Sequence, residues 1–178
     1  MIPVLYPANS TSFTTFGLGA LTDTLSCEVT EERNGVFECI LKYPITGQHY
    51  KLIAKERIIK AKPNDTGEPQ AFRIYRMTKP LDGVVTVYGQ HISYDLANVP
   101  VMPFYAESRS PSLLLNQLLA GDSRFTGWTD YSEAKEFSVT TPKSVRACLG
   151  GTEGSMLSKW HGEFEWDNWK VIHHQGRG

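Results

Sequence analysis

Potential metal ligands gather near the end of the chain. They are His161, Asp167, His173 and His174. The two adjacent histidines lie in an alternating segment that predicts a β-strand, and neighbouring strand residues point to opposite faces of a sheet. Only one of them could therefore join a site with the other ligands. This spacing favours ordinary exposed strand histidines, and no metal-binding residue is predicted.

A thiol nucleophile with a base and an orienting acid is a second possible chemistry. Cys148, His161 and Asp167 have the required residue types, which would make the chain a peptidoglycan endopeptidase. Cys148, however, lies with Val145 and Leu149 in a predicted helix, where a cysteine is usually a small buried hydrophobe. The sequence therefore predicts no catalytic residue, and the endopeptidase is the less favoured alternative.

Tryptophan rings offer a third chemistry, because they can stack on sugars. The four tryptophans are Trp128, Trp160, Trp166 and Trp169. Trp166 and Trp169 flank a predicted tight turn, and aromatic side chains are common both in cores and at subunit interfaces. Core packing or a subunit contact is favoured. A cell-wall carbohydrate-binding module is the main alternative from another functional class.

A glycine-rich segment at 150–155, Gly-Gly-Thr-Glu-Gly-Ser, superficially resembles a phosphate-binding loop. It lacks the lysine and the spacing of the P-loop motif. A tight turn between two helices, with Thr152 capping the second helix, explains the glycines. We therefore expect no bound nucleotide and no other cofactor.

Acid–base residue types also occur together at His91, Ser93 and Asp95. They alternate with Ile92 and Tyr94, so in a strand the three polar side chains would share one face. A polar strand face that meets solvent or a neighbouring subunit is sufficient to explain them.

The composition limits the kind of partner. Lys and Arg total 18 against 19 Asp and Glu, a formal net charge of -1, so no broad attraction to nucleic acid or to an anionic membrane is expected. Hydrophobic residues make up 40% of the 178 residues, which is typical of a globular protein. The first residues lack a basic region, and no segment approaches about 18 consecutive apolar residues. We expect synthesis in the cytoplasm and no membrane insertion.

The secondary structure that positions these residues is predicted to consist of strands in the first hundred residues. Segments with strand-like alternation or β-branched residues occur at 4–6, 25–43, 58–62, 70–79 and 84–88. Turn sequences at 63–69 and 80–83 separate them, with a helical or irregular stretch at 49–57. Repeated hairpins without long helices predict an antiparallel β-barrel-like or sandwich domain over residues 1–98.

The segment 25–43 predicts a hairpin whose two apolar faces must coincide to build a core. These faces are formed by Leu25, Cys27 and Val29 in the first strand and by Phe37, Cys39, Leu41 and Tyr43 in the second. A two-residue loop would put them on opposite sides, whereas a three-residue loop at 33–35 with Gly35 left-handed aligns them. The three-residue loop is therefore expected.

The same register fixes the cysteines of the hairpin. Cys27 then faces Leu41 and Cys39 faces Val29, so the two thiols lie diagonally at roughly 7–8 Å, too far apart for a bridge. With Cys148 the chain has three cysteines and no C-x-x-C pair. All three are expected to be reduced thiols.

A second domain is predicted over residues 99–178. Pro100 and Pro103 exclude a helix at its start and suit an extended linker. Helices are then expected at 111–119, with Ser110 as N-cap, at 141–150 and at 152–160, before a strand hairpin at 163–174. The domain is thus α+β. Because the chain stops at Gly178 directly after a strand, we expect its sheet to be incomplete.

Two stretches of the sequence resemble a known family. The first is QAFRIY at 70–75 followed by VTVYGQHISYDL at 85–96, and the second is LGGTEGSML at 149–157 continuing into WHGEFEWDN at 160–168. In order and spacing they resemble the N-terminal region of siphophage tail-associated proteins, the prophage endopeptidase tail or phage minor structural protein family. Gly89 and Thr152 are the departures from its pattern, and they affect neither fold nor role.

The resemblance implies a fold similar to the contractile-phage baseplate hub, assembled as a homotrimeric ring beneath the tail tube. It also implies docking on a ring of distal tail protein, contact with the tape-measure protein and closure of the tube before DNA ejection. The chain would then lie at the virion tail tip after assembly in the bacterial cytoplasm. Any wall-degrading or receptor-binding module would lie farther along the full polypeptide, so this chain is expected not to be an enzyme.

Overall fold

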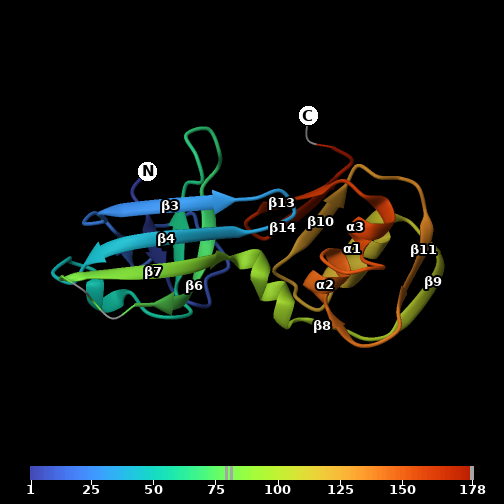
Figure 1. The fold of residues 1–178 in the computed structure, drawn as a ribbon, viewed down its shortest axis with the longest axis horizontal. Helices are drawn as coiled ribbons and strands as arrows, with labels where there is room; N and C mark the ends of the chain where they lie inside the picture. The colour runs from blue at the N-terminus through green and yellow to red at the C-terminus, as the bar shows by residue number, and fades with distance from the viewer. Residues whose placement is uncertain (79, 81, 177–178) are drawn as a thin grey trace. The chain divides into compact units, whose positions relative to one another are not determined.

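The structure is a computed structural model that describes residues 1–78, 80 and 82–176. Its contacts divide the chain into two compact units, Met1–Ile92 and Ser93–Gly178 (Figure 1). Lys79, at the end of the predicted strand 70–79, and Leu81, in the predicted turn 80–83, lie outside the described residues.

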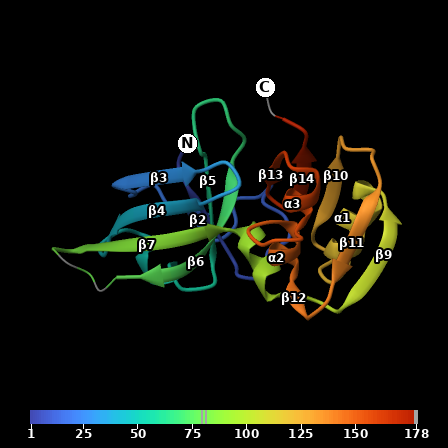
Figure 2. The same cartoon turned by 45° about the vertical axis from the view of Figure 1, so that its right-hand side comes forward.

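The first unit is built on a seven-stranded antiparallel sheet with the order β2-β1-β5-β6-β7-β4-β3. Its strands are β1 (Val4–Tyr6), β2 (Gly19–Ala20), β3 (Ser26–Glu31), β4 (Phe37–Pro44), β5 (Ile58–Ala61), β6 (Gln70–Met77) and β7 (Val84–His91). The short 3-10 helix η1 (Tyr50–Leu52) lies between β4 and β5 in the chain. The sheet curls into a half-barrel (Figure 2), so the predicted mainly β fold with an antiparallel first domain is confirmed.

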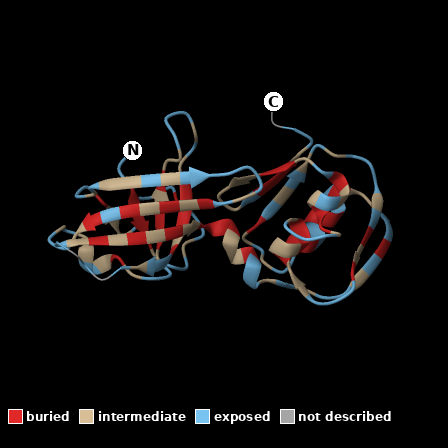
Figure 3. Ribbon diagram, viewed as in Figure 1, coloured by how far each residue is buried: buried red, intermediate tan, exposed pale blue. Residues whose placement is uncertain are grey.

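Buried side chains from alternate positions of the strands form the core of this half-barrel. Buried and more exposed positions alternate along β4 and β7, as Figure 3 shows. The buried residues of β4 are Phe37, Cys39, Leu41 and Tyr43, the set that the sequence predicts. Removing this apolar surface from water stabilises the sheet by roughly 25 cal/mol per Å².

The hairpin between β3 and β4 has the predicted register. Cys27 pairs with Leu41 and Val29 with Cys39, and the backbone N–H of Glu32 donates to the oxygen of Val36 at 2.7 Å, which leaves a three-residue loop. The left-handed residue of this loop is Asn34, with φ 53°, and not Gly35 as predicted. Asparagine tolerates this conformation because its short polar side chain can hydrogen-bond locally.

Two details of the predicted hairpin face are wrong. The sulfur atoms of Cys27 and Cys39 are 3.5 Å apart, because their side chains lean toward each other across the diagonal that the register creates. Both are free thiols. Leu25 precedes β3 and is 61% exposed, so it does not share the buried face.

The first unit ends where β7 gives way to the 3-10 helix η2 (Ile92–Asn98). The sequence predicted that a strand would continue through Asp95, which is wrong. Leu96 packs in the core of the second unit, and Asp95 forms an ion pair with Arg124 there. These contacts make most of η2 part of the second unit. The division therefore falls near the start of η2, whereas the sequence placed it at residue 98.

Over residues 93–176, the second unit combines three small sheets with three short α-helices. Its elements are β8 (Pro100–Val101), β9 (Phe104–Arg109), α1 (Pro111–Leu119), β10 (Thr126–Thr129), β11 (Lys135–Val139), β12 (Lys143–Ser144), α2 (Val145–Leu149), α3 (Met156–Trp160), β13 (Glu163–Asp167) and β14 (Lys170–His174). The sheet orders are β10-β14-β13, β11-β9 and β12-β8. This is the α+β arrangement that the sequence predicts.

The capping residues predicted the helices of this unit only in part. Ser110 caps α1 and Pro111 begins it, as predicted. The segment expected as an extended linker instead forms β8 and β9, because β12 and β11 pair with it. The helices expected at 141–150 and 152–160 are shorter, since Ser144 and Ser155 supply the N-caps.

An apolar core holds the second unit together. It includes leucines of α1 on one side and residues of β13 and β14 on the other, among them Leu115, Phe164 and Val171. In the part of the chain that the structure describes, no helix is long and apolar enough to cross a membrane.

Candidate functional site

The residues considered as potential metal ligands make separate contacts, beginning with His173 in β14. Its ring is fully buried, with Nδ1 3.4 Å from Thr129 Oγ1 and Nε2 2.8 Å from the backbone oxygen of His161. The rings of Tyr131 and Phe164 pack against it, and burial lowers the pKa of His173. The prediction of an exposed histidine is wrong here, because β14 is the central strand of its sheet.

His174 meets different partners from those of His173, as strand alternation predicts. Its Nε2 lies 2.8 Å from Glu165 Oε2 and its Nδ1 3.7 Å from Asp130 Oδ2. Among the described residues, no group of three or more His, Cys, Asp or Glu could hold a metal ion. The two histidines therefore make two unrelated sets of polar contacts.

The three residues considered for a thiol triad, Cys148, His161 and Asp167, each make different contacts. Cys148, in α2, lies in the core of the second unit, where burial raises the pKa of its thiol. A nucleophile needs the opposite shift. His161 follows α3 and offers its backbone oxygen to His173, while Asp167 ends β13 and accepts a hydrogen bond from Asn168 Nδ2 at 3.3 Å.

Three of the four tryptophans contribute to the core of the second unit. Trp160 is 2% exposed, and its Nε1 donates to the backbone oxygen of Glu133 at 2.8 Å. Trp166 and Trp169 are partly buried against the same core. Trp128, in β10, is instead 50% exposed, with its ring centre 6.0 Å from that of His174. Of the four, Trp128 is therefore the one that could stack on a sugar.

The glycine-rich segment 150–155 forms a turn between two helices, as predicted, and two of its glycines have positive φ. The predicted cap is wrong, however. Ser155 caps α3 by accepting a hydrogen bond from the N–H of Ser158, whereas the Thr152 hydroxyl donates to the oxygen of Ala147 at 2.9 Å. The segment thus uses its polar groups to end one helix and start the next.

His91 and Ser93 lie in buried polar contacts. The ring of His91 stacks on Phe37 at 4.5 Å and lies 3.2 Å from Gln70 Oε1, within the first unit. Ser93 is fully buried in the second unit and accepts a hydrogen bond from Arg146. A polar face that meets solvent is therefore the wrong interpretation for these two residues.

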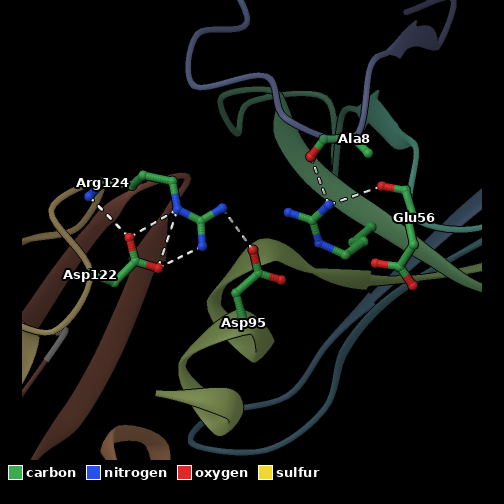
Figure 4. Close-up of polar contacts among 6 residues, drawn as sticks. Ala8, Glu56, Asp95, Asp122 and Arg124 are labelled. Atoms are coloured by element: carbon green, nitrogen blue, oxygen red, sulfur yellow. Dashed lines mark hydrogen bonds and ion pairs between the residues drawn. The ribbon is translucent and has the colours of Figure 1, made fainter. Parts of the chain in front are cut away.

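Asp95 belongs to a charged cluster, which we call the Arg124 cluster, formed by Asp95, Asp122, Arg124 and Trp169. Figure 4 shows Arg124 between the two carboxylates. Its Nη1 lies 3.2 Å from Asp95 Oδ2, its Nε donates to Asp122 Oδ1 at 2.9 Å, and its guanidinium carbon lies 4.6 Å from the Trp169 ring centre. The hydrogen bond to Asp122 raises the pKa of Arg124. The cluster ties η2 to the segment before β10.

Arg146 forms a second tie to η2. Its Nη1 donates to Ser93 Oγ at 3.2 Å, and its guanidinium carbon lies 3.7 Å above the ring of Tyr94 and 5.2 Å from that of Trp166. Burial lowers the pKa of Arg146. The sequence did not identify either arginine, because their partners in η2 are distant in the chain and no motif marks such pairs.

Arg73, in β6, has a similar bracing role in the first unit. Its Nη1 donates to the backbone oxygens of Ala8 and Glu56, each at 2.9 Å (Figure 4). Glu56 has a left-handed backbone conformation, with φ 68°, which glutamate rarely adopts. The hydrogen bond from Arg73 helps to keep the turn at Glu56 in this conformation.

One edge of the first sheet, formed by β3, is a candidate assembly surface. β3 is an end strand of that sheet, and within the described residues it pairs with β4 alone. The backbone N–H of Glu32 donates to the oxygen of Val36, and in an antiparallel pair every second residue of a strand points its N–H toward the partner. The N–H of Thr30 therefore points toward β4, whereas those of Val29 and Glu31 point away from it. Such an edge can accept a strand from another chain. We call Ser26–Glu31 with its outward backbone groups the β3 edge.

Solved structures of phage tail proteins have a similar fold. The chain matches the prophage tail protein gp18 from Listeria monocytogenes EGD-e with a TM-score of 0.71 and 13% identity, over 98% of this chain and 50% of that one. It matches the tail protein from Neisseria meningitidis MC58 with a TM-score of 0.53 and 6% identity, over 78% of this chain and 41% of that one. The chain thus spans half or less of each of these two structures.

The sequence comparisons give no further relatives. No protein-family model matches the chain, and no curated protein matches it. At these identities, the structural likeness shows the fold.

Proposed function

We propose that this chain is a structural part of a phage or prophage tail, the N-terminal part of the tail-tip hub, and not an enzyme. The likeness to the prophage tail protein gp18 carries the proposal, because it extends over 98% of the chain at a TM-score of 0.71. The setting of Cys148 supports the non-enzymatic role, since its thiol is buried and its pKa is raised.

In this proposal, three copies form a ring that docks on the distal tail protein, contacts the tape-measure protein and closes the tube. The hub assembles in the host cytoplasm and then lies at the virion tail tip. A ring needs two different complementary patches on each subunit, and the β3 edge offers one of them. The net charge of -1 means that little repulsion opposes the approach of a second copy.

Light scattering on a longer polypeptide, extended beyond residue 178, tests the hub. We expect a trimer that binds rings of distal tail protein. Glu31→Pro should weaken the trimer while the fold is kept, because the lost N–H faces outward. Thr30→Pro is the matched control, since it removes a bond to β4 and should destabilise the first unit itself. A strictly monomeric longer polypeptide that ignores the ring contradicts the hub assignment.

Glycan binding is a second candidate function, favoured by one observation. The ring of Trp128 is 50% exposed and lies beside His174, which contacts two carboxylates. Aromatic rings flanked by polar side chains can hold sugars. Sedimentation with purified peptidoglycan tests this candidate, and binding that disappears in Trp128→Ala but persists in Tyr105→Ala, a change at another exposed aromatic residue, would favour it.

A further inference from the structure

Two thiols meet on the inner face of the first sheet. The Sγ atoms of Cys27, in β3, and Cys39, in β4, are 3.5 Å apart, although the two residues are not directly opposed. A disulfide requires the sulfurs to close to about 2 Å. Small rotations of the two side chains, with a slight adjustment of β3, can supply this movement because β3 is an end strand.

The two sulfurs differ in access and in acidity. Cys39 is 1% exposed, whereas Cys27 is only partly buried. The hydrogen bond between them lowers the pKa of the Cys27 thiol and raises that of Cys39, so Cys27 is the thiol that ionises more readily. The thiolate is the nucleophile in thiol–disulfide exchange. Cys27 is thus equipped to react first with an external reagent, and Cys39 to resolve the product.

We propose that Cys27 and Cys39 are a modification site, at which a small-molecule disulfide such as glutathione disulfide forms a reversible bridge between β3 and β4. The Cys27 thiolate attacks one glutathione sulfur, forms a mixed disulfide and releases a glutathione thiolate. In the mixed disulfide Cys27 no longer carries the thiolate that raises the pKa of Cys39. The released glutathione thiolate takes the proton of Cys39, and the Cys39 thiolate attacks the Cys27 sulfur and expels the second glutathione. The two thiols are oxidised to one disulfide, and glutathione disulfide is reduced to two glutathione molecules.

The bridge fixes the β3 edge. β3 is joined to its sheet through β4, so a covalent link at Cys27 restrains fraying of the strand that the assembly surface uses. Thiols stay reduced in the cytoplasm and become oxidised outside the cell. On the proposed function, the bridge would therefore form after the particle leaves its host. The chemistry of the bridge does not depend on that function.

Mass spectrometry of the full chain tests the site. The reduced protein, freed of reductant, is incubated with glutathione disulfide, alkylated and digested with trypsin. Cleavage after Arg33 separates the two cysteines, so the bridge joins peptides 1–33 and 34–42. We expect this linked pair, lighter by two hydrogen atoms than its separate parts and lost on reduction. Cys148, in peptide 147–159, is the internal control and should not join either cysteine.

Two variants separate the roles of the thiols. Cys39→Ala should stop at a stable mixed disulfide on Cys27, whereas Cys27→Ala should leave the buried Cys39 unmodified while circular dichroism reports a folded chain. If the folded wild-type protein shows only mixed disulfides or unmodified thiols, the proposal is overturned. Pairing of Cys148 at a comparable rate overturns it too. This chemical readout does not involve assembly, so its failure leaves the tail role standing.

Discussion

Arg124 and Asp95 form an ion pair of 3.2 Å inside the second unit. Asp95 lies in η2, within a run of residues whose types could perform acid–base chemistry. Its carboxylate is instead used to hold η2 against the segment before β10. A polar residue in a run of catalytic residue types can thus contribute to the stability of the fold.

Breaking this pair should destabilise the protein modestly. For Arg124→Gln we expect a loss of about 1 kcal/mol in the free energy of unfolding, because the Arg124 side chain is 31% exposed and solvent screens the pair. Urea denaturation measures this loss. Lys170→Gln removes the same charge from an exposed site in the same unit and should change stability by less than about 0.5 kcal/mol. Equal effects of the two changes would contradict the role of the cluster.

Gly162 is a position that leaves no room for a side chain. It has φ 78°, and an added Cβ would lie 2.1 Å from the backbone oxygen of His174. We expect Gly162→Ala to cost about 3 kcal/mol or more. Gly151→Ala is the matched control, because φ there is 82° but no atom lies within 4 Å, and it should cost about 1 kcal/mol. Thermal unfolding compares the two, and similar losses would refute the predicted clash.

The buried His173 should make stability depend on pH. Burial lowers its pKa in the folded state, so the unfolded chain takes up a proton first as the pH falls. The contribution is fully present above the unfolded pKa of about 6.5 and is lost progressively below it. His173→Phe should be less stable at neutral pH, yet lose less of its free energy of unfolding between about pH 7 and about pH 5. Parallel pH profiles of the two proteins would argue against this assignment.

The isolated chain should release no muropeptides from peptidoglycan. Cys148 is packed in a core and its pKa is raised, so it is not activated as a nucleophile. Chromatography of digested sacculi measures release. Activity that is present in the wild type, absent in Cys148→Ala and retained in Cys27→Ala would show that the thiol acts in catalysis.

Short-range patterns were sufficient to predict much of the fold. The alternation around Cys27 and Cys39 predicted a register that the structure has, and the Ser110-Pro111 pair predicted the start of α1. Both features depend on residues close together in the chain. Alternation also led to a wrong prediction beyond His91, where a strand was expected through Asp95. The spacing of Ile92 and Leu96 fits one face of a helix as well, and the structure has η2 there.

Partners distant in the chain could not be predicted in this way. Arg146 reaches Ser93 across 53 positions, and nothing near either residue indicates the other. The strand β8 pairs with β12, which lies much later in the chain. Because this partner cannot be recognised from the residues near β8, the prolines there suggested a linker. Burial of His173 depends likewise on the strands to either side of β14.

Electron microscopy of phage particles labelled with antibodies tests the central claim most directly. Antibodies are raised against the purified chain, detected with gold, and applied to intact virions and to isolated heads as a control. We expect label at the end of the tail that lies away from the head, and none on isolated heads. Particles whose tail tips carry no label, while the chain is found only in the lysed host, would contradict a tail-tip role.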